Sequence, residues 1–326
     1  MMKINFFKRS PETSLRAKSM LLLSYLNNRR HSYPILFLSF FILLSMKAAA
    51  QATTDKTAIF NRDKIVAWCI VPFDIKKRGP EERSQMLNDL GITKLAYDWR
   101  DSHIPTFDLE VDALKKHNIA LQAFWLYDDG NNNRQLDAAF SFLKRRRVKT
   151  QLWYLFVPPK ESASMTQDEK IAQAAKAVAL IARRADSIGC TVGLYNHNGW
   201  FGEPENQLAI INLLNLKNVG IVYNFNHAQD QTESFAKFYP LILPHLIAIN
   251  LAGLKKGDQH IFPITTTGEE KRMIDIILKS IYTGPIGIIN EDTDPDAAVG
   301  LKKNMDGLRD ILMSLGYERA AKTYLQ

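Results

Sequence analysis

The sequence of 326 residues predicts a single barrel of eight parallel strands, each followed by a helix, after an N-terminal targeting segment. Short runs rich in β-branched and aromatic residues alternate with longer amphipathic stretches from residue 62 to residue 315. Most of the short runs are continuously apolar, which is typical of parallel strands buried on both faces. No stretch rich in proline, glycine or serine interrupts this rhythm, so we expect one domain.

The chain begins with a segment that has the pattern of a secretory signal peptide. Residues 34–46 are nearly all apolar, Arg29 and Arg30 precede them, and a run of three alanines ends at Ala50. The apolar run is shorter than the roughly 20 residues that a membrane-spanning helix needs. We therefore expect residues 1–50 to be a signal peptide, with an uncleaved N-terminal anchor as the alternative.

This segment divides the chain and predicts its location. We expect the mature protein to start near Gln51 and to be exported to the periplasm or the cell envelope. Residues 51–61 would be a linker, 62–315 the barrel and 316–326 a C-terminal tail. Translation from Met20 would give a signal peptide of more ordinary length.

The net charge of +8 belongs almost entirely to the N-terminal segment. Residues 1–50 carry eight of the 42 Lys and Arg side chains but only one of the 34 Asp and Glu side chains. A balanced body argues against nucleic acid as a partner, and membrane contact is expected only through an uncleaved signal segment. The basic run 144–147 is expected to be a solvated helix end, where cations suit the helix dipole.

The individual elements follow from the alternating pattern. Strands are expected at 65–71, 92–97, 120–125, 151–156, 191–195, 220–223, 246–249 and 285–289. Helices are expected at 80–90, 108–117, 132–147, 167–188, 203–215, 231–242, 269–281 and 295–315. Pro80 and two acids mark one helix start, and Thr166 with Glu169 forms a capping box at another. The two cysteines, Cys69 and Cys190, fall on distant strands, so we expect two buried free thiols.

A doubly wound open sheet is the alternative architecture. Such a fold usually has a glycine-rich phosphate loop after its first strand. Here residues 72–76 read Pro-Phe-Asp-Ile-Lys, and the sequence contains no P-loop motif. The barrel is therefore favoured, and nucleotide binding is not expected.

Polar and aromatic residues gather where the expected strands end. The active site of such a barrel lies at the carboxyl ends of its strands. Candidate substrate-binding residues there are Asp98, Arg100, Trp125, Asn196, Trp200, Asn224, Asn250 and Asn290. Hydrogen-bonding side chains combined with flat apolar rings suit a sugar, although Asn and Asp after a strand are also common turn formers.

Two histidines are the main candidates for acid–base chemistry. His197 and His227 follow neighbouring strands by two to four residues, and an unperturbed imidazole titrates close to neutral pH. Glu203, Asp230 and Glu291 are the carboxylates that would orient the histidines or share in proton transfer. Glu203 also has a structural explanation, because an acid stabilises a helix N-terminus.

Several motifs resemble one known family. Gly193–His197 after the fifth strand, Asn224–His227 after the sixth and Gly284–Ile288 at the eighth resemble the xylose isomerase-like, or sugar phosphate isomerase/epimerase, family of TIM barrels. The resemblance covers about residues 62–315. Residues 195–206 are especially similar to secreted members from polysaccharide-degrading bacteria.

The resemblance implies a divalent metal, yet its usual ligands are replaced. Typical members hold the metal with Glu, Asp, His and Glu on strands five to eight. Those positions hold Tyr195, Asn224, Asn250 and, depending on register, Ile289 or Asn290. A neutral carboxamide binds such a cation more weakly than a carboxylate, so we expect no cofactor. A relocated metal site would use His197, His227, Asp230 and Glu291.

The resemblance also implies a reaction class. We expect an enzyme that moves a proton next to the carbonyl of a free or oxidised sugar, by isomerisation, epimerisation, or elimination and hydration of a keto-sugar. The alternative is a carbohydrate-binding barrel that has lost catalysis. A metal-dependent abasic-site endonuclease shares this fold, but the balanced charge, the export signal and the replaced ligands all oppose it.

Overall fold

The computed structural model describes residues 56–131, 133–197, 199–291 and 294–325, and within them eight parallel strands close into a barrel. The strands are β1 (Val66–Trp68), β2 (Lys94–Tyr97), β3 (Ala120–Asp128), β4 (Gln151–Phe156), β5 (Thr191–Tyr195), β6 (Val219–Asn224), β7 (Leu246–Leu251) and β10 (Ile286–Ile289). Neighbouring strands pair in chain order, and β10 pairs with β1 to close the barrel. The predicted fold is confirmed.

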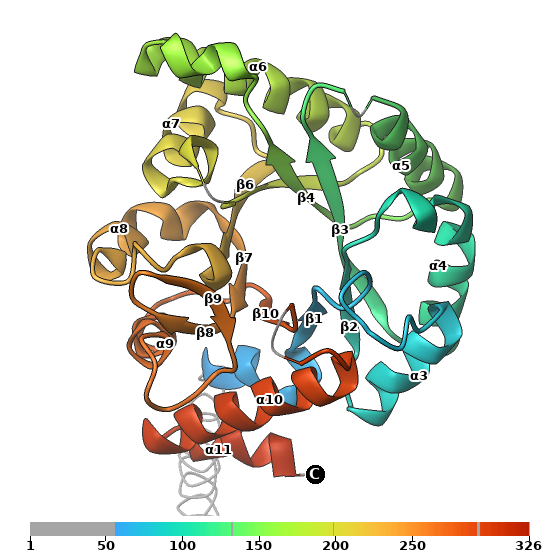
Figure 1. Cartoon of the computed structure of the whole chain (residues 1–326), viewed down its shortest axis with the longest axis vertical. Coiled ribbons are helices and arrows are strands. Elements are labelled where there is room, and N and C mark those ends of the chain that lie inside the picture. Colours follow the sequence, from blue (N-terminus) through green and yellow to red (C-terminus); the bar gives the residue numbers. More distant parts are fainter. Residues whose placement is uncertain (1–55, 132, 198, 292–293, 326) are drawn as a thin grey trace, which may run out of the picture. The chain divides into compact units, whose positions relative to one another are not determined.

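Helices surround the barrel in chain order (Figure 1). They are α3 (Pro80–Asp89), α4 (Phe107–Lys116), α5 (Asn133–Arg146), α6 (Gln167–Asp186), α7 (Pro204–Leu214), α8 (Phe235–Ile242), α9 (Glu270–Lys279), α10 (Ala297–Ser314) and α11 (Glu318–Lys322). The capping box predicted for α6 is present, because the Thr166 backbone N–H donates to the Glu169 carboxylate at 2.8 Å. No helix of the described residues is long and apolar enough to cross a membrane. The signal segment predicted for residues 1–50 lies outside the described residues.

Aromatic rings fill the upper interior of the barrel. The Trp68 ring centroid lies 4.7 Å from that of Trp153 and 5.9 Å from that of Tyr195. The Trp125 ring meets Tyr195 edge to face at 4.8 Å. Rings at these distances and angles attract one another beyond the gain from burying their area. The floor beneath the mouth is therefore a rigid aromatic layer.

Two glycines make room for large inward-facing side chains. A Cβ atom on Gly193 would collide with Val222 and Ile247, and one on Gly220 would collide with Ile247. Both glycines lie in neighbouring strands, where they are register partners. Substituting either would force the β5, β6 and β7 strands apart.

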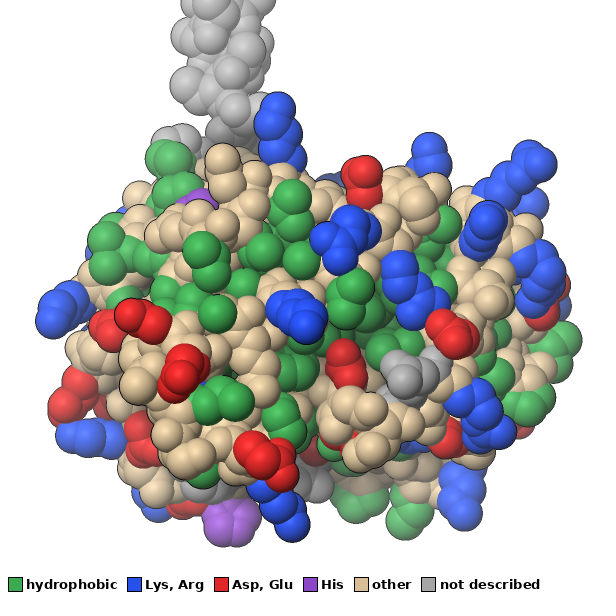
Figure 2. Space-filling model, turned by 90° about the horizontal axis from the view of Figure 1, so that it is seen from above, with side chains coloured by type: hydrophobic (Ala, Val, Ile, Leu, Met, Phe, Trp, Pro, Cys, Tyr) green, Lys and Arg blue, Asp and Glu red, His purple; other side chains and the backbone are tan. Residues whose placement is uncertain are grey.

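The surface of the barrel carries mixed charge. Lys and Arg side chains are interspersed with Asp and Glu side chains on the face shown in Figure 2. The basic run 144–147 ends α5 as expected, and Arg145 pairs with Asp108 of α4 at 2.6 Å. Arg146 pairs with Asp112 and Asp108 of the same helix. This run therefore ties two helices together at the surface.

The structure differs from the prediction at several element boundaries. β1 ends at Trp68 rather than residue 71, because Cys69 has a left-handed backbone with φ 55° and the chain leaves the sheet there. α8 begins at Phe235 rather than residue 231. After β7 the chain forms a two-stranded hairpin, β8 (Gly253–Lys255) and β9 (Asp258–Phe262), which the strand–helix rhythm did not predict.

The C-terminal residues are also more ordered than a tail. Helix α11 buries Ala320 and Ala321, and the Tyr324 hydroxyl donates to the Phe60 carbonyl at 2.7 Å. Thr323 accepts a hydrogen bond from the Arg62 backbone at 3.0 Å. Residues expected to form a linker and a tail thus pack together. The two cysteines are buried and free, as predicted.

Candidate functional site

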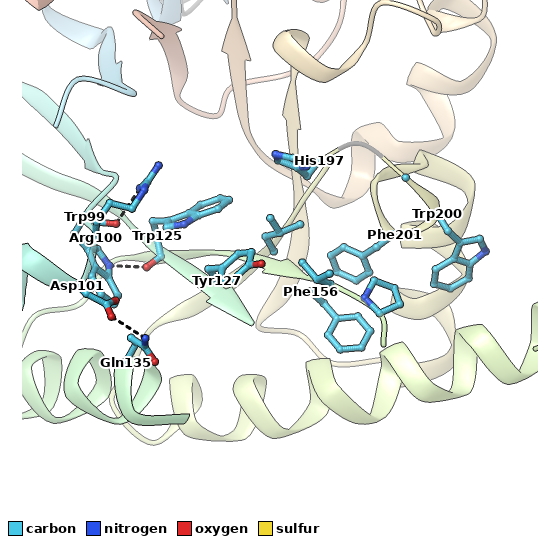
Figure 3. A pocket seen from close by; sticks show the side chains of 14 residues that line it. Trp99, Arg100, Asp101, Trp125, Tyr127, Gln135, Phe156, His197, Trp200 and Phe201 are labelled. Carbon is cyan, nitrogen blue, oxygen red and sulfur yellow. Dashed lines mark hydrogen bonds between the residues drawn. The ribbon is translucent and has the colours of Figure 1, made fainter. Parts of the chain in front are cut away.

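A pocket of about 700 Å³ opens at the carboxyl ends of β3, β4 and β5 (Figure 3). We call it the aromatic pocket. Its walls are Trp99, Arg100, Asp101, Trp125, Tyr127, Gln135, Leu155, Phe156, Val157, Pro158, His197, Gly199, Trp200 and Phe201. This volume lies in the range of small-molecule sites, and mostly apolar walls with a few polar groups are typical of them.

Short hydrogen bonds fix the walls of the aromatic pocket. Trp125 and Tyr127 both line it, because alternate residues of a strand face the same side. The Trp99 indole donates to the Trp125 carbonyl at 2.7 Å, which ties the loop after β2 to β3. The Gln135 amide of α5 donates to the Asp101 carboxylate at 2.9 Å. The pocket is therefore formed before any ligand arrives.

The structure brings the two candidate histidines together. The ring centroids of His197 and His227 lie 4.2 Å apart, with the ring planes inclined at 43°. His197 follows β5 and lines the aromatic pocket. His227 is the last residue of a single helical turn after β6 and is not among the residues that line this pocket. Burial lowers the pKa of His197, and burial together with the nearby His197 lowers the pKa of His227 to about 3. Both rings are neutral at neutral pH, and His197 is the one of the two that lines the pocket, where it can accept a proton from a ligand.

Two asparagines support the histidines from below. The Asn196 amide donates to the Asn224 carbonyl at 3.1 Å and accepts from the Asn224 backbone N–H at 2.5 Å. The Asn224 side chain in turn accepts from the Asn226 N–H at 3.0 Å, which starts the turn that carries His227. Both Asn196 and Asn224 are buried. Asn196, predicted to bind substrate, therefore clamps the ends of β5 and β6 together.

A polar layer lies in the barrel interior at the predicted positions. The Tyr195 hydroxyl accepts a hydrogen bond from the Trp68 indole at 3.0 Å and another from the Asn224 amide. Asn250 is the register partner of Asn224 on the next strand and is buried. Its side-chain oxygen and nitrogen have no hydrogen-bond partner among the described residues. Burying an amide without hydrogen-bond partners lowers the free energy of unfolding.

The register of β10 with β1 shows which residue of this last strand faces the barrel interior. Ile289 is the register partner of Trp68, whose ring lies in the barrel interior. Asn290 instead donates to the Asp294 carbonyl at 3.2 Å, and its side chain packs against Gly300 of α10. Asn290 therefore faces the outer helix and not the pocket. This orientation opposes its predicted role in substrate binding.

These residues do not fit the metal that the family resemblance implies. The Tyr195 phenol is held neutral, because burial raises its pKa well above the usual value. The Asn224 oxygen is already bonded to a backbone N–H, and Ile289 offers no donor atom. Hard divalent cations prefer several charged oxygens. Within the described residues, no group of three or more His, Cys, Asp or Glu side chains is placed to hold a metal, the relocated set included.

An acidic group lies at the ends of β1, β2 and β10. Asp98 is buried and accepts from the Val71 backbone N–H at 3.2 Å, and burial raises its pKa to about 7. Burial, and then the charges of Asp98 and Glu291, raise the pKa of Cys69. Glu291 therefore lies beside Cys69, across the barrel from the loops after β5 and β6 that carry His197 and His227. Cys69 was predicted only as a buried thiol, and its place here had no sequence signal.

The other predicted residues divide into two sets. Arg100 and Trp200 line the aromatic pocket with Trp125 and His197, and the Trp200 indole is held by Gln167 at 2.8 Å. Glu203 is exposed at the start of α7, where it accepts from the Gln231 amide at 3.0 Å. Asp230 is exposed as well. Neither carboxylate is among the residues that line this pocket.

Several pocket residues were missed by the sequence reasoning. Tyr127 could have been found, because it follows Trp125 by the two-residue period of a strand. Phe156 belongs to an apolar run and Phe201 to the segment after the fifth strand, and the sequence marks the direction of neither side chain. Gln135 lies on a helix and reaches the pocket only through the fold.

The closed barrel with its pocket at the carboxyl ends of the strands defines this protein as a TIM barrel. Solved structures with the same fold include the apo form of 3-keto-D-glucoside 4-epimerase YcjR from E. coli, which is 15% identical with a TM-score of 0.57, over 79% of this chain and 99% of that one. The zinc-binding IolI protein is 11% identical with a TM-score of 0.57, over 77% and 99% of the two chains. A xylose isomerase-like protein from Mycobacterium smegmatis, in complex with magnesium, is 14% identical with a TM-score of 0.53, over 77% and 97%.

The family follows from the sequence itself. Residues 94–311 match the family model of the xylose isomerase-like TIM barrels, and the chain belongs to this family. No curated protein matches the sequence significantly. The resemblance in the strand-end motifs is therefore confirmed at the level of family and fold.

Proposed function

We propose that this protein is a sugar-modifying enzyme that transfers a proton next to the carbonyl of a free or oxidised sugar. The observation that carries the proposal is the contact of His197 and His227 at 4.2 Å, with His197 on the wall of the aromatic pocket. The membership of this chain in the xylose isomerase-like family and the shared fold of a 3-keto-D-glucoside 4-epimerase support the same class of reaction.

The aromatic pocket suits a sugar ring. Trp125 and Trp200 present flat faces on which the C–H bonds of a sugar can pack, and Arg100 supplies hydrogen-bond donors. The Trp125 ring packs against Tyr195 and the Trp200 ring is hydrogen-bonded to Gln167, so little ordering is needed when a sugar binds.

The proton chemistry follows from the neutral imidazoles. His197 accepts the proton from the carbon next to the carbonyl, and the electrons of that C–H bond form an enediolate. Delivery of a proton from water to the opposite face of that carbon gives epimerisation, with the proton on His197 released to solvent. Protonation of the neighbouring carbon by His197, together with transfer of the hydroxyl proton from its oxygen to the former carbonyl oxygen, gives isomerisation. His227 stays neutral at working pH, because its pKa lies far below it, so it can only orient His197 by hydrogen bonding or packing.

A non-catalytic carbohydrate-binding barrel is the second candidate. It is favoured by the interior layer, where Tyr195, Asn224 and Ile289 stand at the positions that hold the metal in typical family members. Such a barrel would keep the aromatic pocket and bind a sugar without changing it.

Incubation with a panel of aldoses, ketoses and 3-keto-sugars, followed by NMR, separates the two candidates. We expect new sugar resonances with the wild type, and a loss of rate of about 10²–10⁴-fold in His197→Gln, the usual contribution of a positioned proton-transfer group. His245→Gln is the matched control, because His245 precedes β7 at the opposite end of the barrel. Binding without any new product would contradict the enzyme and support the second candidate.

We also propose that the enzyme works outside the cytoplasm. The support is the pattern of the N-terminal 50 residues, in which a basic pair, a short apolar run and three alanines follow one another. Its substrate would then be an extracellular or periplasmic sugar, which agrees with the absence of a glycine-rich phosphate loop in the sequence.

A further inference from the structure

A second pocket of about 710 Å³ adjoins the aromatic pocket. It lies between the loop after β1 and the loop after β2, and Arg100 lines both pockets. We call it the basic pocket, because Lys77, Arg78, Arg83, Arg100 and His103 line it with one acid, Asp74. Nothing in the chemistry proposed above uses it.

Two of these cations are neutralised by the protein. The Arg78 guanidinium donates to both oxygens of Asp74, at 2.8 and 2.9 Å, and to Asp296 at 2.8 Å. Arg83 forms a buried ion pair with Glu110. These pairs hold the loop after β1 against α3, α4 and the start of α10, and they leave no net charge for a ligand.

Arg100 is fixed by the backbone and forms no salt bridge with a described residue, although its charge acts on the nearby Asp98 carboxyl and lowers the pKa of that group against the effect of burial. Its Nη1 donates to the backbone carbonyls of Asp98, at 2.7 Å, and of Trp99, at 2.9 Å. Its guanidinium also lies over the Phe73 ring, 5.6 Å from the centroid. Neither Nη2 nor Nε has a hydrogen-bond partner among the described residues. A guanidinium held in this way presents a fork that matches the two oxygens of an oxyanion.

Lys77 adds a second charge on the basic pocket only. It is exposed, lines this pocket and not the aromatic one, and has no ion pair with a described residue. A turn holds its backbone, because the Lys77 N–H donates to the Asp74 carbonyl at 2.8 Å. The basic pocket therefore keeps two cations, Lys77 and Arg100, that form no salt bridge with the described residues, and Arg100 lies on the wall shared with the aromatic pocket.

We infer that the basic pocket binds a sugar unit that carries a carboxylate or a sulfate ester, linked to the unit in the aromatic pocket. The substrate of the proposed enzyme is then an acidic disaccharide or a longer chain. This inference rests on the proposed function for the occupant of the aromatic pocket. The two volumes support it, since each leaves room for one sugar unit, and Arg100 lies where the linked units meet.

The test is calorimetric binding of neutral disaccharides, their uronic acid counterparts and their sulfated counterparts, in gluco, galacto and manno configurations. We expect the acidic members to bind about 10-fold more tightly than the neutral ones, a preference that falls as salt is raised. Lys77→Gln should lower affinity for the acidic sugars about threefold to tenfold and leave the neutral ones unchanged. Lys237→Gln, an exposed lysine of α8, is the matched control and should change neither. The carboxylate and sulfate arms show which oxyanion the pocket takes.

Two results would overturn the inference, and they are distinguishable. Equal binding of neutral and acidic sugars, unaffected by Lys77→Gln, would refute the basic pocket as a subsite and leave the proposed function standing. Binding of none of the disaccharides would also refute the inference, while the NMR assay with aldoses, ketoses and 3-keto-sugars decides the proposed function separately. Binding of inorganic sulfate with no preference among the sugars would identify a simple anion site and would also refute the inference.

Discussion

Replacing His227 by glutamine should change how the stability of the protein depends on pH. His227 has a folded-state pKa of about 3, against about 6.5 for an unfolded histidine. Its contribution to stability is therefore present above about pH 6.5 and is lost as the pH falls toward 3, because the unfolded chain binds the proton first. Between about pH 7.5 and about pH 5 this loss amounts to about 2 kcal/mol for one such group.

Urea unfolding at these two pH values measures the effect. The free energy of unfolding of His227→Gln, relative to wild type, should rise by about 2 kcal/mol on going from the higher to the lower pH. His245→Gln is the control and should follow the wild type. Parallel pH dependences of wild type and His227→Gln would refute the burial of a neutral histidine beside His197.

The remaining predictions concern the acidic group, the strand clamp, the metal and the N-terminus. Asp98→Asn should have the opposite effect to His227→Gln, because the stability given by a carboxyl with a raised pKa is lost as the pH rises through about 7. The free energy of unfolding of the variant, relative to wild type, should therefore be about 2 kcal/mol lower at pH 5 than at pH 7.5. A difference that does not depend on pH would contradict this. Asn196→Ala should lower the free energy of unfolding by about 2–4 kcal/mol in the same urea assay, because it leaves the buried backbone groups of Asn224 unpaired. A change below about 1 kcal/mol would refute the role of Asn196 in holding the ends of β5 and β6 together. Elemental analysis of purified protein should give less than one Mn, Mg, Zn or Co per chain, whereas one tightly held ion per chain would revive a relocated metal site. N-terminal sequencing of the cell-envelope form should read from near Gln51, and recovery of the full-length chain from the cytosol would defeat the export proposal.

The barrel could be predicted because the sequence signals of its strands and helices are local. Apolar runs and helix caps such as Thr166 recur once per unit, and the fold follows from their order. The short β1 could not be predicted, because it ends where Cys69 adopts a left-handed backbone, a conformation that the apolar run through residue 71 does not signal. The hairpin after β7 was missed for a related reason, since it inserts strands into a position where the rhythm predicts a loop.

The sequence indicated where the residues of the site lie in the fold, but not which way their side chains point. His197 and His227 lie together because they follow neighbouring strands, which chain order alone indicates. Whether a side chain after a strand faces the pocket depends on the turn it enters. Asn196 turns to the backbone of Asn224, and Asn290 turns to α10. These directions are set by tertiary contacts that no sequence period records.

Solvent deuterium incorporation reports directly whether this protein removes a proton next to a sugar carbonyl. A keto-sugar that the protein binds is incubated with it in D₂O, and NMR follows the hydrogen on the carbon next to the carbonyl. We expect exchange at that carbon with wild-type protein and a rate at least about 100-fold lower with His197→Gln at similar affinity. Tight binding with no exchange above the rate in buffer, or exchange that is equally fast in His197→Gln, would contradict it.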